Sequence, residues 1–242
     1  MPNKQVGVVI PARNEERHLP GVLDTVLASD WLTQIVVVDD RSADSTQEIA
    51  REAARQDERL TVVHLDSSSG KSRALLAGVH ALQDGVEEVI FMDADLIGMR
   101  TDHIEALYEP LGSKRCQMAV AVFRSGGLRT TAAQIATPNL SGQRCMRRSV
   151  AYRALNLLEN SGYGVEIGLT LYARRNRWNI VYVPWRGVTH MVQESKHGLI
   201  RGLRARSVMY AQVLATWMQY RKDEHWLHPI TTPRADMDDS LL

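Results

Sequence analysis

Two carboxylates stand at the end of an apolar run, where they could bind a metal ion. Residues 89–92 read Val-Ile-Phe-Met and are followed by Asp93, Ala94 and Asp95. An apolar run of this kind is typical of a strand buried on both faces, as in a parallel sheet. Ligands of such sheets bind beyond the carboxyl ends of the strands, and oxygen ligands there suit Mg²⁺ or Mn²⁺ carrying a diphosphate. A helix cap or a turn is the alternative role, because Asp serves both.

The elements that would position these carboxylates alternate along the first half of the chain, which predicts βαβ units and a mostly parallel sheet. Strands are expected at residues 6–10, 35–38, 60–65 and 88–92, and helices at 19–27, 42–55 and 71–82. Three polar clusters then directly follow predicted strands, at residues 11–16, 39–42 and 93–95. Chance does not favour this alignment with the ligand-binding ends of the strands.

The second half of the chain is less regular. A strand is expected at residues 118–123, a loop at 124–138, helices at 149–158 and 165–175, and a further strand at 180–183. Two prolines and three aspartates follow Trp226, so we expect a poorly ordered tail.

Composition bounds the class of protein. The chain has 242 residues, 44% of them hydrophobic, which is enough for one domain or for one domain with an appendage. A net charge of +1 gives no argument for a nucleic-acid partner. Cys116 and Cys145 lie far apart, which argues against a disulfide framework or a zinc ribbon. No apolar run approaches the ~18 residues of a membrane span and no signal peptide is visible, so a cytoplasmic protein is expected.

Four motifs follow one another over about ninety residues: VVIPARNEE, VVVDDRSADST, GKSRAL and VIFMDADL. Together they resemble the donor half of a family 2-type glycosyltransferase. The resemblance implies an α/β protein with the GT-A fold, in which a mostly parallel, Rossmann-like sheet lies between helices and binds a nucleotide-diphosphate sugar. The stretch GYGVEIGL at 162–169 is similar to glucosyl-3-phosphoglycerate synthases, whereas the chain length is more similar to that of polyprenyl-phosphate glycosyltransferases.

We expect a single GT-A domain at residues 1–198 and a C-terminal helical extension at 199–242. The domain would have a nucleotide-binding half at 1–95 and an acceptor half at 96–198. Apolar residues recur with helical spacing between 199 and 217, with arginines nearby. This stripe could lie on a membrane surface, but docking on the protein's own core or on a sister subunit is the favoured interpretation.

The resemblance also implies a donor site. Its expected residues are Pro11, Ala12, Arg13, Glu15, Asp39, Asp40, Ser42, Lys71 and Asp93. Glu15 would hold the donor ribose, Asp39 and Asp40 would meet the nucleobase, and Lys71 would neutralise the diphosphate. The alternatives are a favourable helix-dipole contact for Glu15 and helix capping for the two aspartates. For Lys71 the alternative is a solvated surface lysine.

The same resemblance implies a metal ion, Mg²⁺ or Mn²⁺. Asp95 is the expected direct ligand, Asp93 would contact the metal or the ribose, and His190 matches a metal-binding histidine of related enzymes. Imidazole suits Mn²⁺ better than Mg²⁺. The metal and Lys71 would stabilise the charge that develops on the leaving diphosphate, so Lys71 and Asp95 are expected catalytic residues. A basic segment at 196–204 could close over the diphosphate, or it could be a basic helix face.

Glu166 is the third expected catalytic residue, and its role is open. Inverting enzymes need a general base, and many members of the resembling family place an Asp near this position. Here Val165-Glu166-Ile167 contains no such Asp. A phosphate acceptor is already ionised and needs no base, so we expect Glu166 to contact hydroxyl groups of the donor or acceptor.

The expected acceptor-binding residues are Gly142, Gln143, Arg144 and Arg147, with Arg148 nearby. Arginine binds phosphate or carboxylate in a bidentate manner, although these arginines could equally lie on a helix surface.

The predicted function is metal-dependent transfer of a sugar, from a donor of the UDP-glucose or GDP-mannose type, to a phosphate- or carboxylate-bearing acceptor. Transfer to a polyprenyl phosphate, with peripheral contact at the inner membrane face, is one alternative. Another is a non-catalytic nucleotide-sugar-binding protein. A sugar-nucleotide pyrophosphorylase would carry a Gly-rich loop after the first strand, where this chain has Pro-Ala-Arg-Asn-Glu. A homodimer stays open.

Overall fold

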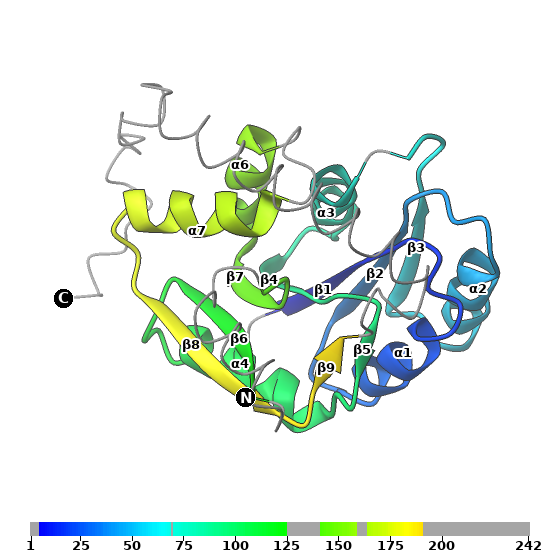
Figure 1. Cartoon of the computed structure of the whole chain (residues 1–242), viewed down its shortest axis with the longest axis horizontal. Coiled ribbons are helices and arrows are strands. Elements are labelled where there is room, and N and C mark those ends of the chain that lie inside the picture. The colour runs from blue at the N-terminus through cyan, green and yellow to red at the C-terminus, as the bar shows by residue number, and fades with distance from the viewer. Residues whose placement is uncertain (1–4, 69, 125–140, 159–163, 191–242) are drawn as a thin grey trace, which may run out of the picture.

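A seven-stranded sheet forms the centre of the protein, in the strand order β3-β2-β1-β4-β7-β6-β8 (Figure 1). The computed structural model describes residues 5–68, 70–124, 141–158 and 164–190. The strands of this sheet are β1 (Gln5–Ala12), β2 (Gln34–Asp39), β3 (Leu60–His64), β4 (Val86–Phe91), β6 (Met118–Arg124), β7 (Arg144–Arg147) and β8 (Ile180–Arg186). Of these seven, β7 alone runs against its neighbours.

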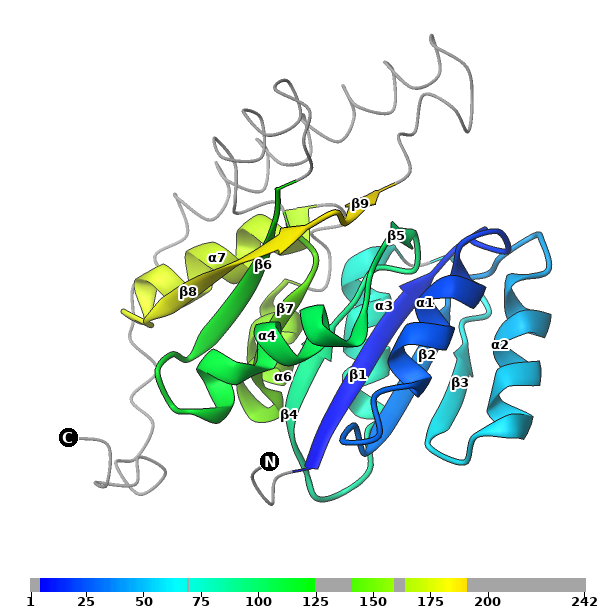
Figure 2. The same ribbon diagram turned by 90° about the horizontal axis from the view of Figure 1, so that it is seen from below.

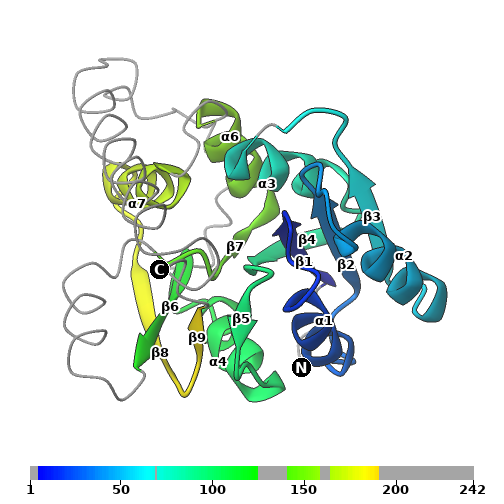
Figure 3. The ribbon, with the colours of Figure 1, turned by 45° about the vertical axis from the view of Figure 1, so that its right-hand side comes forward.

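Helices cover both faces of the sheet (Figure 3). They are α1 (Leu19–Leu27), α2 (Thr46–Gln56), α3 (Lys71–His80), α4 (Thr101–Gly112), α6 (Arg148–Leu157) and α7 (Val165–Arg175). One core cluster joins α1 and α4 to one face, and a second joins α3, α6 and α7 to the other. Successive strand residues point to opposite faces, so Val8 and Ile10 of β1 enter the first cluster and Val9 enters the second. The apolar strands are therefore buried on both sides, as a covered parallel sheet requires.

A small second sheet lies beyond the end of β4. Its strands, β5 (Leu96–Ile97) and β9 (Thr189–His190), are antiparallel, and Leu96 pairs with His190. The turns that lead into this ribbon come close together, since a Cβ on Gly98 would lie 2.5 Å from the carbonyl oxygen of Gly187. Both glycines have a φ of +76°, which other residues rarely adopt.

The predicted fold class is confirmed, with local differences. Figure 2 shows β1, β2 and β3 side by side, as the βαβ pattern predicts. The helix expected from Ser42 begins at Thr46, because the backbone N–H groups of Ser42, Ala43 and Ser45 bond to side chains instead. Among the described residues, no helix has the length and apolar character needed to cross a membrane. The loop expected at 124–138 falls largely outside the described residues, as do the basic segment at 196–204 and the extension at 199–242.

Candidate active site

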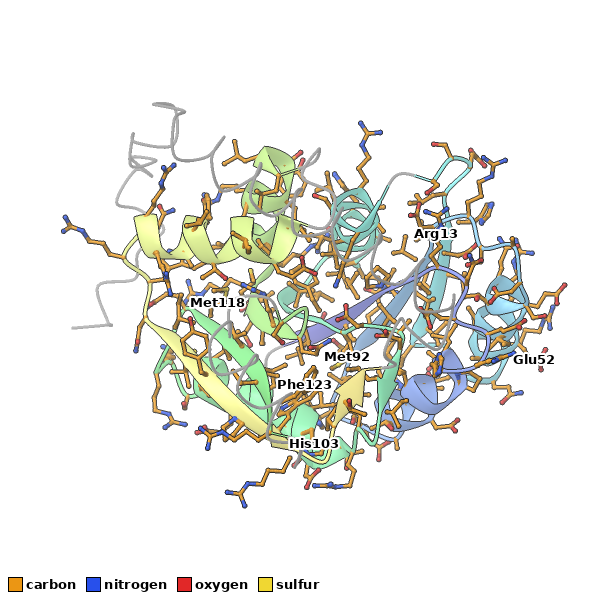
Figure 4. All side chains as sticks on the ribbon, in the orientation of Figure 1. Arg13, Glu52, Met92, His103, Met118 and Phe123 are labelled. Atoms are coloured by element: carbon orange, nitrogen blue, oxygen red, sulfur yellow. The ribbon has the colours of Figure 1, made fainter. Side chains whose placement is uncertain are left out.

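The three polar clusters predicted from the sequence, at residues 11–16, 39–42 and 93–95, lie together at one edge of the sheet. Ala12, the last residue of β1, pairs with Asp39, the last residue of β2. The backbone N–H of Met92 donates to the Val9 carbonyl at 3.1 Å, which keeps the end of β4 aligned with β1. Arg13 and Met92, both labelled in Figure 4, follow these two neighbouring strands. Parallel pairing therefore delivers the polar residues to a common edge.

Lys71 joins two carboxylates that are far apart in the sequence. Its Nζ lies 2.6 Å from Oδ1 of Asp93 and 2.6 Å from Oε1 of Glu166. The three side chains are 20%, 15% and 10% exposed, respectively. Lys71 begins α3 and Glu166 lies in the first turn of α7, so the positive ends of two helices meet here.

The two carboxylates keep Lys71 charged. Desolvation by burial lowers the pKa of Lys71, but the charges and hydrogen bonds of Asp93 and Glu166 outweigh it and hold the pKa well above its usual value. A lysine at a helix N-terminus opposes the helix dipole, and the two ion pairs offset that penalty. The placement differs from that of a solvated surface lysine, which was the alternative interpretation.

Asp93 is held on its other side by residues that precede β7. The side-chain amide of Gln143 donates to Oδ2 of Asp93 at 2.7 Å. The hydroxyl of Ser141 donates to Oε1 of Gln143 at 3.0 Å. Both Gln143 and Gly142 are buried. Sequence reasoning missed Ser141, and it assigned Gln143 to the acceptor.

The end of β1 connects to the start of α2 through a set of polar bonds. The backbone N–H of Glu15 donates to the Thr46 hydroxyl at 2.8 Å, and Oε2 of Glu15 lies 3.1 Å from Nδ1 of His18. Ser42 is one of the residues expected to bind the sugar donor. Its hydroxyl accepts a hydrogen bond from the Asn14 backbone N–H at 2.9 Å. The exposed Arg13 donates to the Ser68 hydroxyl at 2.6 Å. These bonds fix the backbone over the carboxyl ends of β1 and β2.

Asp39 bonds to protein groups through both of its carboxylate oxygens, and its expected contact with a nucleobase stays a prediction. Its side chain is fully buried. Oδ1 accepts from the Ser42 backbone N–H at 3.1 Å, and Oδ2 lies 2.8 Å from Nδ1 of His64. Asp39 thus ties β2 to β3 and to the turn before α2. Oδ2 of Asp40 accepts from the Gly70 N–H at 3.1 Å, which anchors the turn that begins α3.

Asp95 is the expected metal ligand, and the fold brings the backbone of His190 next to it. Asp95 is partly buried and directly precedes Leu96, the pairing partner of His190. The side chain of His190 lies outside what the structure describes. Among the side chains that the structure does describe, three His, Cys, Asp or Glu groups do not come together to hold a metal. Asp95 and Asp93 are therefore the described candidates for metal ligands.

The expected arginine pair of the acceptor site does not converge. Arg144 is fully buried; its Nη1 donates to the Thr170 hydroxyl at 2.8 Å, and its Nε donates to the Ser141 carbonyl at 2.9 Å. Burial lowers the pKa of Arg144 to about 10, which leaves it charged at neutral pH. Arg147 pairs with Glu88, three residues farther from the edge, because β7 runs antiparallel to β4.

Arg148 also has a structural task, since its guanidinium donates to the carbonyls of Leu82 and Gln83, both at 2.7 Å. Thr170 was missed by sequence reasoning, although it lies one helical turn after Glu166 and donates to that residue's carbonyl at 3.0 Å. The i, i+4 spacing was the available signal.

Comparison with known proteins identifies related sequences. The family described as glycosyl transferase family 2 matches residues 7–184. An undecaprenyl-phosphate 4-deoxy-4-formamido-L-arabinose transferase of Yersinia pestis (strain Pestoides F) is 31% identical over 192 residues, which cover 72% of this chain and 58% of the relative. The enzyme of the same name from Yersinia pseudotuberculosis serotype O:3 (strain YPIII) gives the same values. The chain thus spans less than two thirds of these curated relatives.

Solved structures show the same fold. A glucosyl-3-phosphoglycerate synthase from Mycobacterium tuberculosis, in complex with Mn²⁺, UDP and glucosyl-3-phosphoglycerate, has a TM-score of 0.67 and 25% identity over 90% of this chain and 80% of that chain. Its complex with Mg²⁺ and UDP has the same TM-score and identity over 90% and 79%. The sequence match spans more than half of the chain, so the chain belongs to glycosyl transferase family 2.

Proposed function

We propose that this protein transfers a sugar from a nucleoside diphosphate sugar to an acceptor that carries a phosphate or carboxylate group. The observation that carries the proposal is the meeting of Lys71, Asp93 and Glu166 at the sheet edge where ligands of parallel sheets bind. Two carboxylates and a buried ammonium group at this edge provide contacts for sugar hydroxyls and for phosphate oxygens. Family membership supports the same reaction class.

A divalent metal fits the residues at this edge. Asp95 provides a hard oxygen ligand, and the β5–β9 pairing brings residue 190 beside it, so that Asp95 and His190 would hold Mg²⁺ or Mn²⁺. Asp93 contributes less, because Gln143 and Lys71 already bond to its two oxygens. The metal, when bound, would supply positive charge against the diphosphate. The synthase from M. tuberculosis has been crystallised with either ion together with UDP.

The chain's own residues would orient the sugar donor and stabilise the negative charge on the departing diphosphate. Lys71 holds an ammonium group in a fixed position, which favours negative charge on the departing diphosphate. Glu166 would accept hydrogen bonds from sugar hydroxyls on the other side of that ammonium group. Glu15 and Ser42 would position the nucleoside from the end of β1. An ionised phosphate oxygen of the acceptor would form the new bond to the anomeric carbon as the bond from that carbon to the diphosphate breaks, and it would need no general base.

Phosphate is the acceptor chemistry shared by the related proteins. Structures of the M. tuberculosis synthase contain phosphoglyceric acid or glycerol 3-phosphate, and the Yersinia relatives are named for undecaprenyl phosphate. A polyprenyl phosphate, reached by peripheral contact with a membrane, is the second candidate because those relatives support it. The acceptor half would in either case lie within residues 96–198.

Calorimetric titration tests the donor site directly. Wild-type protein should bind UDP or GDP in the presence of Mn²⁺, and Asp95→Asn should weaken that binding at least ~tenfold, as loss of a metal ligand does. Asp102→Asn is the control, because Asp102 is exposed at the start of α4 and pairs with Arg100. Absence of binding to both nucleotides would show that the proposed function is wrong.

A mass-spectrometric screen of donor sugars against acceptors then identifies the reaction. The acceptors include small phosphorylated acids and a polyprenyl phosphate in vesicles. Product with the small acids alone excludes the membrane alternative, and product with the lipid alone favours it. Nucleotide binding without transfer across the whole panel would support a non-catalytic binding protein.

A further inference from the structure

The side chain of Gln143 is fixed at both ends of its amide. Its Nε2 donates to Oδ2 of Asp93 at 2.7 Å, and its Oε1 accepts from the Ser141 hydroxyl at 3.0 Å. A carboxylate oxygen only accepts hydrogen bonds, so the nitrogen of the amide must be the atom that faces Asp93. Gln143 has 0% of its surface exposed. A side chain with no exposed surface does not meet an acceptor that arrives from solvent.

Gly142 provides the space that the Asp93 carboxylate occupies. A Cβ on Gly142 would lie 2.4 Å from Oδ2 and 2.7 Å from Oδ1 of Asp93. Gly142 is not among the residues with positive φ, so its backbone does not require glycine. The close approach of the carboxylate is the reason that a side chain is excluded here.

The reversed direction of β7 explains why these residues meet Asp93. Arg144, the first residue of β7, pairs with Phe91, the last residue of β4. Because β7 is antiparallel to β4, β7 begins at the edge of the sheet where β4 ends. Residues 141–143 therefore lie across from residues 92–94. The Gln143 carbonyl also accepts from the Ala121 N–H of β6 at 3.0 Å, which fixes the backbone from the other side.

We infer that Ser141, Gly142 and Gln143 form a cradle that positions the Asp93 carboxylate, and through Asp93 the ammonium group of Lys71, and that they do not contact the acceptor. The cradle orients Oδ2 toward Gln143 and leaves Oδ1 for Lys71. Gln143 is thus a positioning residue. The inference rests on the proposed function only where it expects the cradle to support donor binding.

Nucleotide binding in the absence of acceptor separates this role from acceptor contact. Gln143→Met keeps the length of the side chain but cannot donate to Asp93. Affinity for UDP with Mn²⁺ should fall roughly tenfold, as for other residues that support a ligand-binding carboxylate. Ser141→Ala removes only the hydroxyl that orients the amide, and should weaken binding about threefold while leaving the fold intact. An increase in the acceptor KM alone, with unchanged nucleotide affinity, would overturn the inference.

A double-mutant cycle on thermal unfolding tests the contact without any ligand. Asp93→Ala and Gln143→Met should lower the Tm by less in combination than the sum of the two single changes, because each removes the hydrogen bond between residues 93 and 143. Gln117→Met is the matched control, because Gln117 accepts from the Asn179 N–H in a contact that does not involve Asp93. The Tm change of Gln117→Met should add to that of Asp93→Ala, and Gln117→Met should leave nucleotide affinity unchanged.

The two measurements fail in different ways. If the wild type binds no nucleotide, the proposed function is wrong, and the unfolding cycle still decides whether the cradle exists. If the wild type binds nucleotide but Gln143→Met and Asp93→Ala have additive effects on Tm, the cradle is wrong and the proposed function stands.

Discussion

Replacement of Lys71 by methionine is the most direct test of how the site is held together. The change keeps the length of the side chain and removes the ammonium group that lies 2.6 Å from both Asp93 and Glu166. Two carboxylates that are at most 15% exposed then face each other without the cation between them. Removal of one partner of a buried ion pair costs about 3–5 kcal/mol, because the remaining charge stays desolvated.

We take the lower end of that range, since the three side chains keep some contact with solvent. A loss of about 3 kcal/mol corresponds to a Tm decrease of roughly 6–12 °C for a domain of this size. Differential scanning calorimetry at pH 7 measures it. Arg55→Met on α2 is the matched control, because Arg55 forms an ion pair with Glu52 in which the two side chains are 70% and 57% exposed. The control should change the Tm by less than about 3 °C.

The triple variant with Asp93→Asn and Glu166→Gln added to Lys71→Met sharpens the test. It removes all three charges, so that no uncompensated charge stays buried, and an uncompensated charge is the main cost of Lys71→Met. The triple variant should therefore recover a large part of the Tm lost in Lys71→Met. A Tm for Lys71→Met within 3 °C of wild type, or a triple variant less stable than Lys71→Met, would refute the reasoning.

Three further predictions follow from groups in and around the core. Because the pKa of Lys71 is raised in the folded state, its contribution to stability is complete below the usual lysine value of 10.5 and is lost progressively as the pH rises from there through the raised pKa; the difference between the urea midpoints of wild type and Lys71→Met should therefore be constant up to about pH 10 and narrow above it. Arg59 donates to the carbonyls of Leu27, Ser29 and Leu32, so Arg59→Met should lower the Tm by roughly 4–8 °C while nucleotide affinity stays unchanged in calorimetric titration. Burial raises the pKa of the Cys116 thiol to about 11 and that of Cys145 well above its usual value, so mass spectrometry after iodoacetamide treatment at pH 8 should find both unmodified in folded protein and modified in urea.

The first half of the fold was predictable because its strands are continuous apolar runs that can be recognised in the sequence. The apolar runs at β1, β2 and β4 are buried on both faces, which is what a parallel sheet between helices requires. Since parallel strands end at one edge, the polar residues after those runs had to lie there. This reasoning predicted that residues 11–16, 39–42 and 93–95 would share an edge, whereas the place of Lys71 in the donor site came only from the family resemblance.

Strand β7 could not be predicted in the same way. Its four residues are Arg-Cys-Met-Arg, a sequence that is less typical of a central strand than of a polar surface. Pairing with β4 and β6 makes them a strand, and tertiary contacts of this kind override local preference. The burial of Arg144, and the contact of Gln143 with Asp93, both depend on that pairing. For this reason the sequence suggested acceptor binding for residues that support the carboxylate.

The alternation of side chains along β2 explains why Asp39 is buried. Ile35 and Val37 enter one core cluster, and Val36 and Val38 enter the other. Asp39 continues the parity of Ile35 and Val37, so its side chain points toward a covered face of the sheet, where His64 and the Ser42 backbone bond to it. Sequence alternation gives the parity, but it does not show that helices cover both faces as far as the last residue of the strand.

Lys71 pairs with two carboxylates, and in the proposed function it would also bind a phosphate of the donor. The geometry of its ammonium group makes these two roles compatible. An ammonium group has three N–H donors, and the described ion pairs with Asp93 and Glu166 use two of them. One fifth of the side chain is exposed, and in the proposed function the third N–H would donate to a phosphate oxygen while both ion pairs persist. Release of the carboxylates would instead cost several kcal/mol on every binding event. The two carboxylates that offset the unfavourable position of Lys71 at a helix start also hold its charge in place. Under the proposed function that charge would be fixed before the donor arrives, and a charge fixed in advance needs no reorganisation when the leaving group departs.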